Sequence, residues 1–166
     1  MGKSGKAHPY KKNEKTDEKK VEAFVVETDQ PKINQPLRPG THLRMGQVSL
    51  IPTENEILMN GRKIVLIPTE DVHGIMQSLE AVLSSTVQMG LRPVNVCVRD
   101  FLMENVKIIP ASWKKHSIFF PGSVFTAPGG EPCVPFIYWH CGWSWHNITL
   151  TSMKDVLGKN AVVAAV

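Results

Sequence analysis

The sequence predicts an α+β domain dominated by β-structure, in which an antiparallel sheet, curved or in two layers, packs on one long helix. Segments rich in β-branched residues recur along residues 21–166 between Pro and Gly turns, and residues 70–89 have helical periodicity. The alternative is a jelly-roll-like β-sandwich with that helix inserted between strands. A chain of 166 residues, 42% of them hydrophobic, is long enough for one such domain.

The first half of the domain is predicted to contain strands around one proline-containing loop. Residues 21–28 have the β-branched content of a strand, and residues 29–41, with three Pro, form the loop. Three more strands are expected at residues 42–52, 56–59 and 62–67. Asn60-Gly61 separates the last two, and because both residues tolerate a positive φ, a tight hairpin is expected there.

A helix is predicted over residues 70–89. Thr69 can cap its first amides, and Glu70 and Asp71 complement the positive end of the helix dipole. Gly90 is a suitable C-terminal stop. The apolar residues of this segment recur every three or four positions and comprise Val72, Ile75, Met76, Leu79, Val82 and Leu83.

The second half is predicted to be β-rich again. Residues 93–98 alternate Val with other residues, which indicates a strand. Further strands are expected at residues 101–109, 116–120, 123–127, 134–139 and 143–151. A short helix is expected to begin at Ser152, and the apolar segment 161–166 is expected to be buried because an exposed one would be adhesive.

The charge of the chain is concentrated at its start. Residues 1–20 contain seven Lys and three acidic residues, which equals the whole net charge of +4, while residues 21–166 are balanced. This segment has too few apolar residues to bury, so we expect a disordered basic arm that binds phosphates. Its lysines are Lys3, Lys6, Lys11, Lys12, Lys15, Lys19 and Lys20.

An aromatic cluster at residues 136–146 (FIYWHCGWSWH) is the densest group of chemically distinctive residues. Exposed aromatic rings stack on unpaired bases, although a Trp-rich core is the alternative interpretation. The predicted stacking residues are Trp113, Tyr138, Trp139, Trp143 and Trp145. Basic residues that would contact phosphates beside them are Arg62, Lys63, Lys114 and Lys115.

Catalytic and metal-binding patterns are weak in this sequence. Cys141 could be paired with His116 or His146, but no nucleophile signature surrounds it, and there is no C-x-x-C pair for zinc. Asp100 and Glu104 are expected to be solvated residues. We therefore expect no catalytic residue, no metal and no cofactor.

The leading functional hypothesis is non-enzymatic binding of single-stranded DNA or RNA by a homo-oligomer. The alternative is a small viral coat protein whose basic arm contacts the packaged genome. No apolar run approaches the roughly 18 residues of a membrane span, and the polar start argues against a secretory signal. We therefore expect a location in the cytoplasm or nucleus, or in a virion.

Overall fold

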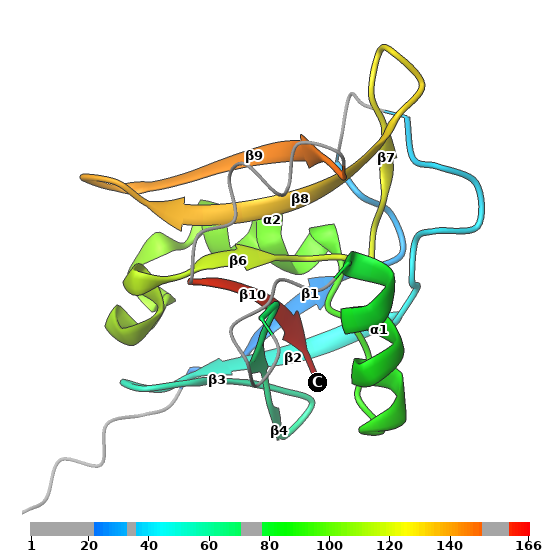
Figure 1. Cartoon of the computed structure of the whole chain (residues 1–166). Coiled ribbons are helices and arrows are strands. Elements are labelled where there is room, and N and C mark those ends of the chain that lie inside the picture. Colours follow the sequence, from blue (N-terminus) through cyan, green and yellow to red (C-terminus); the bar gives the residue numbers. More distant parts are fainter. Residues whose placement is uncertain (1–21, 33–35, 71–77, 151–159) are drawn as a thin grey trace, which may run out of the picture.

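The computed structural model describes residues 22–32, 36–70, 78–150 and 160–166. Within these ranges the chain has a mixed α+β fold with two sheets and two α-helices, in which strands predominate (Figure 1). The predicted α+β class is therefore confirmed. The basic arm (1–20) and the short helix expected after Ser152 lie outside the described residues.

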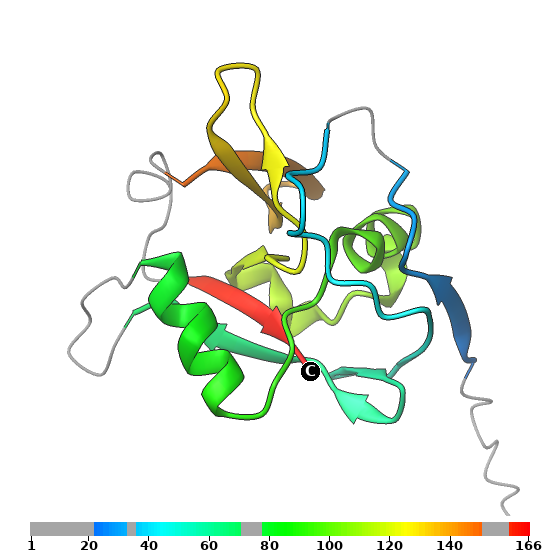
Figure 2. The same ribbon diagram turned by 90° about the vertical axis from the view of Figure 1, so that its right-hand side faces the viewer.

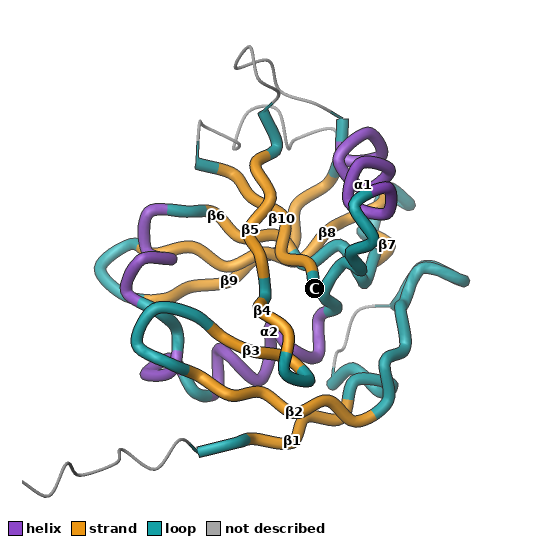
Figure 3. The backbone as a smooth tube through the Cα atoms, turned by 90° about the horizontal axis from the view of Figure 1, so that it is seen from below, coloured by secondary structure: helices purple, strands orange, loops and turns teal. Residues whose placement is uncertain are grey.

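The smaller sheet is an antiparallel meander built by the first half of the chain (Figure 3). Its strands, in spatial order, are β1 (Phe24–Glu27), β2 (Gln47–Pro52), β3 (Ile57–Met59) and β4 (Arg62–Lys63). Asn60-Gly61 joins β3 to β4 with φ angles of 50° and 77°. The predicted hairpin is confirmed, because both turn residues adopt the positive φ that a two-residue turn requires.

The larger sheet combines strands from the middle and the end of the described chain. Its strand order is β5 (Val65–Pro68), β10 (Ala161–Ala165), β6 (Ser117–Phe119), β8 (Pro132–Trp139) and β7 (Phe125–Thr126), and β9 (Trp143–Thr149) also pairs with β8. The β10–β6 pair is parallel, and the other pairs are antiparallel. The β10–β6 pair departs from the predicted antiparallel sheet, and it is also incompatible with the jelly-roll alternative, whose strands are all antiparallel.

The segment 161–166 is buried, as predicted. Each of its residues is less than 9% exposed, and β10 lies between β5 and β6. A strand that is apolar along its whole length needs cover on both faces of the sheet, and β10 contributes residues to an apolar cluster on each face.

The larger sheet separates two apolar clusters, because successive residues of a strand point to opposite faces. Ile118, Ile137 and Val162 face a cluster shared with β2, β3 and the helix α2 (Val96–Glu104). Phe119 and Val163 face the other cluster, which includes residues of α1 (Leu79–Gln88). The two helices accordingly lie on opposite sides of β10 (Figure 2).

The helix predicted at residues 70–89 is shorter within the described residues, and residues 71–77 lie outside them. The N-cap of α1 is Ser78, whose Oγ accepts a hydrogen bond from the Ala81 backbone N–H (3.2 Å). The predicted cap, Thr69, instead donates its hydroxyl to the Ala161 carbonyl of β10 (3.2 Å). The predicted stop is confirmed, because Gly90 follows the helix with a φ of 71°.

The strands predicted at residues 93–98 and 101–109 are wrong, since this region forms α2 and then a short 3₁₀ helix, η1 (Val106–Ile108). Asn95 caps α2 by accepting a hydrogen bond from the Cys97 backbone N–H (3.1 Å). Val96 and Val98 are fully buried although they lie on different sides of the helix. When a helix is buried on several sides, its apolar residues are not confined to one stripe. Over a short segment, that pattern cannot be distinguished from the pattern of a buried strand. In the described part of the chain, no helix has the length and apolar content to cross a bilayer.

Candidate functional site

The hairpin formed by β8 and β9 carries four of the predicted aromatic residues and distributes them over two faces. Trp139 is paired with Trp143, and Ile137 with Trp145, so the three Trp side chains share one face. Tyr138 is paired with Ser144 and points to the opposite face. The alternation of strand residues therefore divides a cluster that is continuous in sequence.

Trp139 and Trp143 line a groove of about 620 Å³ at the closed end of this hairpin. Their ring centroids are 5.7 Å apart and their planes cross at 78°. The Lys114 Nζ lies 3.9 Å from the Trp139 ring centroid, a cation–π contact. Lys107 also lines the groove. Two aromatic rings and two ammonium groups thus border one cavity.

Lys114 reaches this groove because a buried residue fixes the segment that carries it. The 3₁₀ helix η2 (Ala111–Lys115) follows η1 and places Trp113 in the core, only 5% exposed. Three residues complete each turn of such a helix, so Lys114 and Lys115 are directed to the surface. The prediction that Trp113 stacks on bases is therefore wrong, since its ring is covered by core residues.

Trp139 and Trp143 differ in exposure in a way that suits a binding surface. Trp139 is 39% exposed, whereas Trp143 is half-buried and packs against the main core cluster. The core contact holds the Trp143 ring in place, and Lys114 contacts the face of the Trp139 ring. The pair is thus partly organised before any ligand arrives. The joined ends of β8 and β9 lie on the same side of the molecule as η1 and η2 (Figure 1).

Trp145 lies in a separate hollow of about 330 Å³ with a different electrostatic character. The Arg99 guanidinium carbon is 4.4 Å from the Trp145 ring centroid. Asp100, Glu104 and Lys32 also line this hollow, so its two cationic and two anionic groups balance. Trp145 is 48% exposed but lacks the excess positive charge found beside Trp139.

Asp100 and Glu104 were expected to be solvated, and this expectation is wrong for Asp100. The Arg99 Nε donates to the Asp100 carboxylate (2.8 Å), and the Arg99 side chain is only 2% exposed. Burial raises the pKa of Asp100 and lowers the pKa of Arg99, while their mutual attraction opposes both shifts. Glu104 forms an exposed ion pair with Lys32 (3.3 Å).

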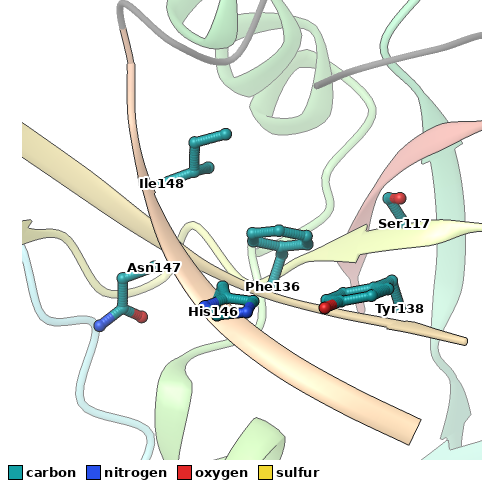
Figure 4. Close-up of a pocket in the computed structure, with 6 residues that line it drawn as sticks. All are labelled: Ser117, Phe136, Tyr138, His146, Asn147 and Ile148. Carbon is teal, nitrogen blue, oxygen red and sulfur yellow. The ribbon is translucent and has the colours of Figure 1, made fainter. Parts of the chain in front are cut away.

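Tyr138 lines a third hollow, of about 370 Å³, on the opposite face of the hairpin (Figure 4). Its ring stacks on His146 with centroids 6.0 Å apart and on Phe136 with centroids 5.6 Å apart. Ser117 and Asn147 contribute polar groups to this hollow. No lysine or arginine of the described residues lines it, so it lacks the positive charge found at the Trp139 groove.

The remaining predicted basic residues do not line the Trp139 groove. Arg62 and Lys63 lie on the exposed strand β4, where the Lys63 ammonium pairs with the Glu56 carboxylate (3.0 Å). Lys115 is exposed beside Lys114 but does not line the cavity. The seven lysines of the arm lie outside the described residues.

Two charged residues of the groove were not predicted from the sequence. Lys107 belongs to η1, which was predicted as a strand, and Glu54 belongs to the turn between β2 and β3. Both are brought to Trp139 by tertiary packing, because the groove walls come from three separate segments of the chain. No local pattern around either residue distinguishes it from an ordinary surface charge.

The three cysteines are free thiols with different environments. Cys97 and Cys133 are buried, whereas Cys141 is exposed at the turn between β8 and β9. Burial, with Asp100 and Asp29 nearby, raises the pKa of Cys97 to about 12, and burial also raises the pKa of Cys133. Within the described residues, no three His, Cys, Asp or Glu side chains are grouped to hold a metal ion.

The difference in burial among the three cysteines predicts that one thiol per folded chain reacts quickly with a disulfide reagent at pH 8. With a pKa of about 12, Cys97 has on the order of one thiolate in ten thousand molecules at that pH. Ellman's reagent should therefore titrate one thiol in the native protein and three after denaturation. The Cys141→Ser variant should lose the fast reaction, and rapid labelling of Cys97 would contradict the assigned burial.

Comparison of the chain with protein-family models, with curated proteins and with solved structures finds no match.

Proposed function

We propose that this protein binds single-stranded nucleic acid without catalysing a reaction. The lysines of the arm contact phosphates, and the Trp139 groove receives unpaired bases. The observation that carries the proposal is the contact between Lys114 and Trp139 beside Trp143, in one groove that Lys107 also lines. To bind one nucleotide, a site needs an aromatic surface for the base and a cation for the phosphate, no farther apart than the length of that nucleotide. This groove supplies both groups.

Two chemical features favour a single strand over a duplex. The faces of paired bases are covered by their neighbours in a duplex, whereas unpaired bases stack on exposed aromatic rings for roughly 1–3 kcal/mol each. The partly exposed ring of Trp139 can be contacted in this way, and Trp143 supports it at a right angle. Such stacking tolerates every base because each has a π-face.

The charge distribution assigns different roles to the arm and to the domain. Residues 21–166 carry no net charge, so their attraction for a polyanion is local to the lysines at the groove. The arm holds the net charge of +4 and supplies affinity that weakens as salt concentration rises. Removing residues 1–20 should therefore flatten the salt dependence and leave residual binding at the groove.

The decisive variant is Trp139→Ala, measured by fluorescence anisotropy of a labelled oligo-dT. Loss of one stacked base should weaken binding about tenfold, from the energy of a single base–aromatic stack. Trp145→Ala is the matched control, because Trp145 is more exposed than Trp139 (48% against 39%) but lies in the charge-balanced hollow. Its affinity should stay within about twofold of the wild type, since it removes no base-stacking surface at the groove.

Two results would contradict the proposal. The full chain could fail to bind oligo-dT and oligo-U even at low salt, which would exclude nucleic-acid binding by both the arm and the groove. The Trp145 variant could instead lose as much affinity as the Trp139 variant, in which case the groove would not be the site.

A further inference from the structure

We infer that the Trp139 groove prefers guanine among the unpaired bases, and that Glu54 provides this preference. The inference rests on the proposed function and specifies the ligand of the same site. Glu54 is the one acidic residue among the described residues that line the groove, where Lys107 and Lys114 are the cations. A site that only followed the phosphate backbone would be weakened by this carboxylate, because it repels phosphates.

The Glu54 carboxylate is available to a ligand. Within the described part of the chain it has no ion-pair partner, whereas its neighbour Glu56 is engaged by Lys63 at 3.0 Å. The turn that carries Glu54 is closed by three hydrogen bonds between its ends. The Thr53 N–H and hydroxyl both donate to the Glu56 carbonyl (2.8 and 3.0 Å), and the Glu56 N–H donates to the Thr53 Oγ1 (3.1 Å). The backbone of Glu54 is thus held at the groove.

A carboxylate accepts hydrogen bonds and donates none, so it selects a base with donors on its open edge. Guanine offers two adjacent donors, N1–H and the 2-amino group, which match the two oxygens of one carboxylate. Adenine and cytosine offer an amino group beside a ring nitrogen that repels the second oxygen. Uracil and thymine offer one N–H between two carbonyls. Guanine is therefore the base whose Watson–Crick edge fits Glu54 best.

The size and charge of the groove agree with a nucleotide as occupant. Its volume of about 620 Å³ falls within the roughly 300–1,000 Å³ of small-ligand sites. A base that stacks on the Trp139 ring directs its edge sideways, which is where a carboxylate must lie to accept from it. The lysines of the same groove complement the phosphate of that nucleotide, and the Glu54 carboxylate complements the donors on the edge of its base.

The test uses the full-length protein and labelled RNA nonamers in which one central base varies within a run of uridines. The central base is guanine, hypoxanthine, adenine, cytosine or uracil. We expect the guanine oligomer to bind about tenfold more tightly than the uracil one, since a bidentate contact discriminates at that level. The hypoxanthine oligomer, which lacks the 2-amino donor, should be intermediate.

Glu54→Gln should remove the preference for guanine while leaving oligo-U affinity equal to or higher than that of the wild type. Glu131→Gln is the matched control, because Glu131 directly precedes β8, whose other end is Trp139, and does not line the groove. It should keep the preference.

The possible failures separate the two proposals. Equal binding of all five oligomers, with loss of affinity in Trp139→Ala, would overturn the guanine preference and leave single-strand binding intact. Retention of the preference in Glu54→Gln would also overturn it. Failure of every oligomer to bind at low salt would instead overturn the proposed function itself.

Discussion

The Arg99→Met variant is expected to lose about 3 kcal/mol of unfolding free energy at pH 7, because it removes one partner of a buried ion pair. Arg99 is 2% exposed and connects α2 to β9. Its Nε donates to Asp100 (2.8 Å), its Nη1 donates to the Asn147 Oδ1 (3.3 Å), and its guanidinium covers the Trp145 ring. Methionine fills similar space but leaves the Asp100 carboxylate without its counter-charge.

The loss should depend on pH, and the sign follows from Asp100. Burial raises the pKa of Asp100, and Arg99 partly offsets this rise. Without Arg99 the pKa rises further, so the folded state retains a proton that the unfolded state releases near pH 3.9. Stability of the variant should therefore fall more steeply than that of the wild type as pH rises above about 4. Urea unfolding at pH 4 and pH 7 measures this difference.

Two controls separate charge from packing. The double variant Arg99→Met/Asp100→Asn should recover part of the stability at pH 7 and lose the added pH dependence. Lys32→Met breaks the exposed pair with Glu104 and should change stability by about 0.5 kcal/mol or less. If Arg99→Met lost the same unfolding free energy at pH 4 and at pH 7, the loss would come from packing and not from the unpaired Asp100 carboxylate.

The Gly122→Ala variant is expected to lose about 3 kcal/mol, at the upper end of the usual cost of overpacking. A Cβ at this position would lie 2.8 Å from the backbone atoms Asn95 N, Pro93 O and Val94 C. These atoms cannot rotate away as a side chain would. The Gly122 N–H also donates to the Val94 carbonyl (3.0 Å), and its own carbonyl accepts from the Leu43 N–H (2.7 Å). Moving this backbone would strain the start of α2.

Gly129→Ala is the matched control for this variant. Nothing lies within 4 Å of the added Cβ at Gly129, which is exposed in the loop before β8. Thermal unfolding followed by circular dichroism should show a large decrease in the melting temperature for Gly122→Ala and little change for Gly129→Ala. Equal melting temperatures for the two variants would contradict the close packing of Gly122 against the backbone of residues 93–95.

Features of the fold that depend on residues adjacent in the sequence were predictable. Asn60-Gly61 forms the hairpin turn and Gly90 ends α1, since both depend on a positive φ that few residues adopt. The strands expected near residues 116–120 and 134–139 are present as β6 and β8. The α2 helix was missed because burial on several sides removes the one-sided apolar stripe by which a helix is recognised.

The candidate site was predictable only in part. Trp139 and Trp143 were predicted from the aromatic cluster and Lys114 from its place beside Trp113, and the structure brings the three together. Lys107 and Glu54 were not predicted, because they reach the groove from η1 and from the turn after β2. Trp139 lies 32 residues after Lys107 and 85 residues after Glu54, so no local pattern encodes their place at the groove.

The sequence by itself determined the concentration of positive charge in residues 1–20, the hairpin turn and the alternation that separates Tyr138 from its neighbours. Tertiary structure alone decided which of the alternating faces is covered. It buried Trp113 in the core, placed Trp145 beside Arg99 and left Trp139 in the lysine-lined groove. The physical reason is that residue type sets the tendency of a side chain to be buried, whereas its exposure depends on the segments packed around it.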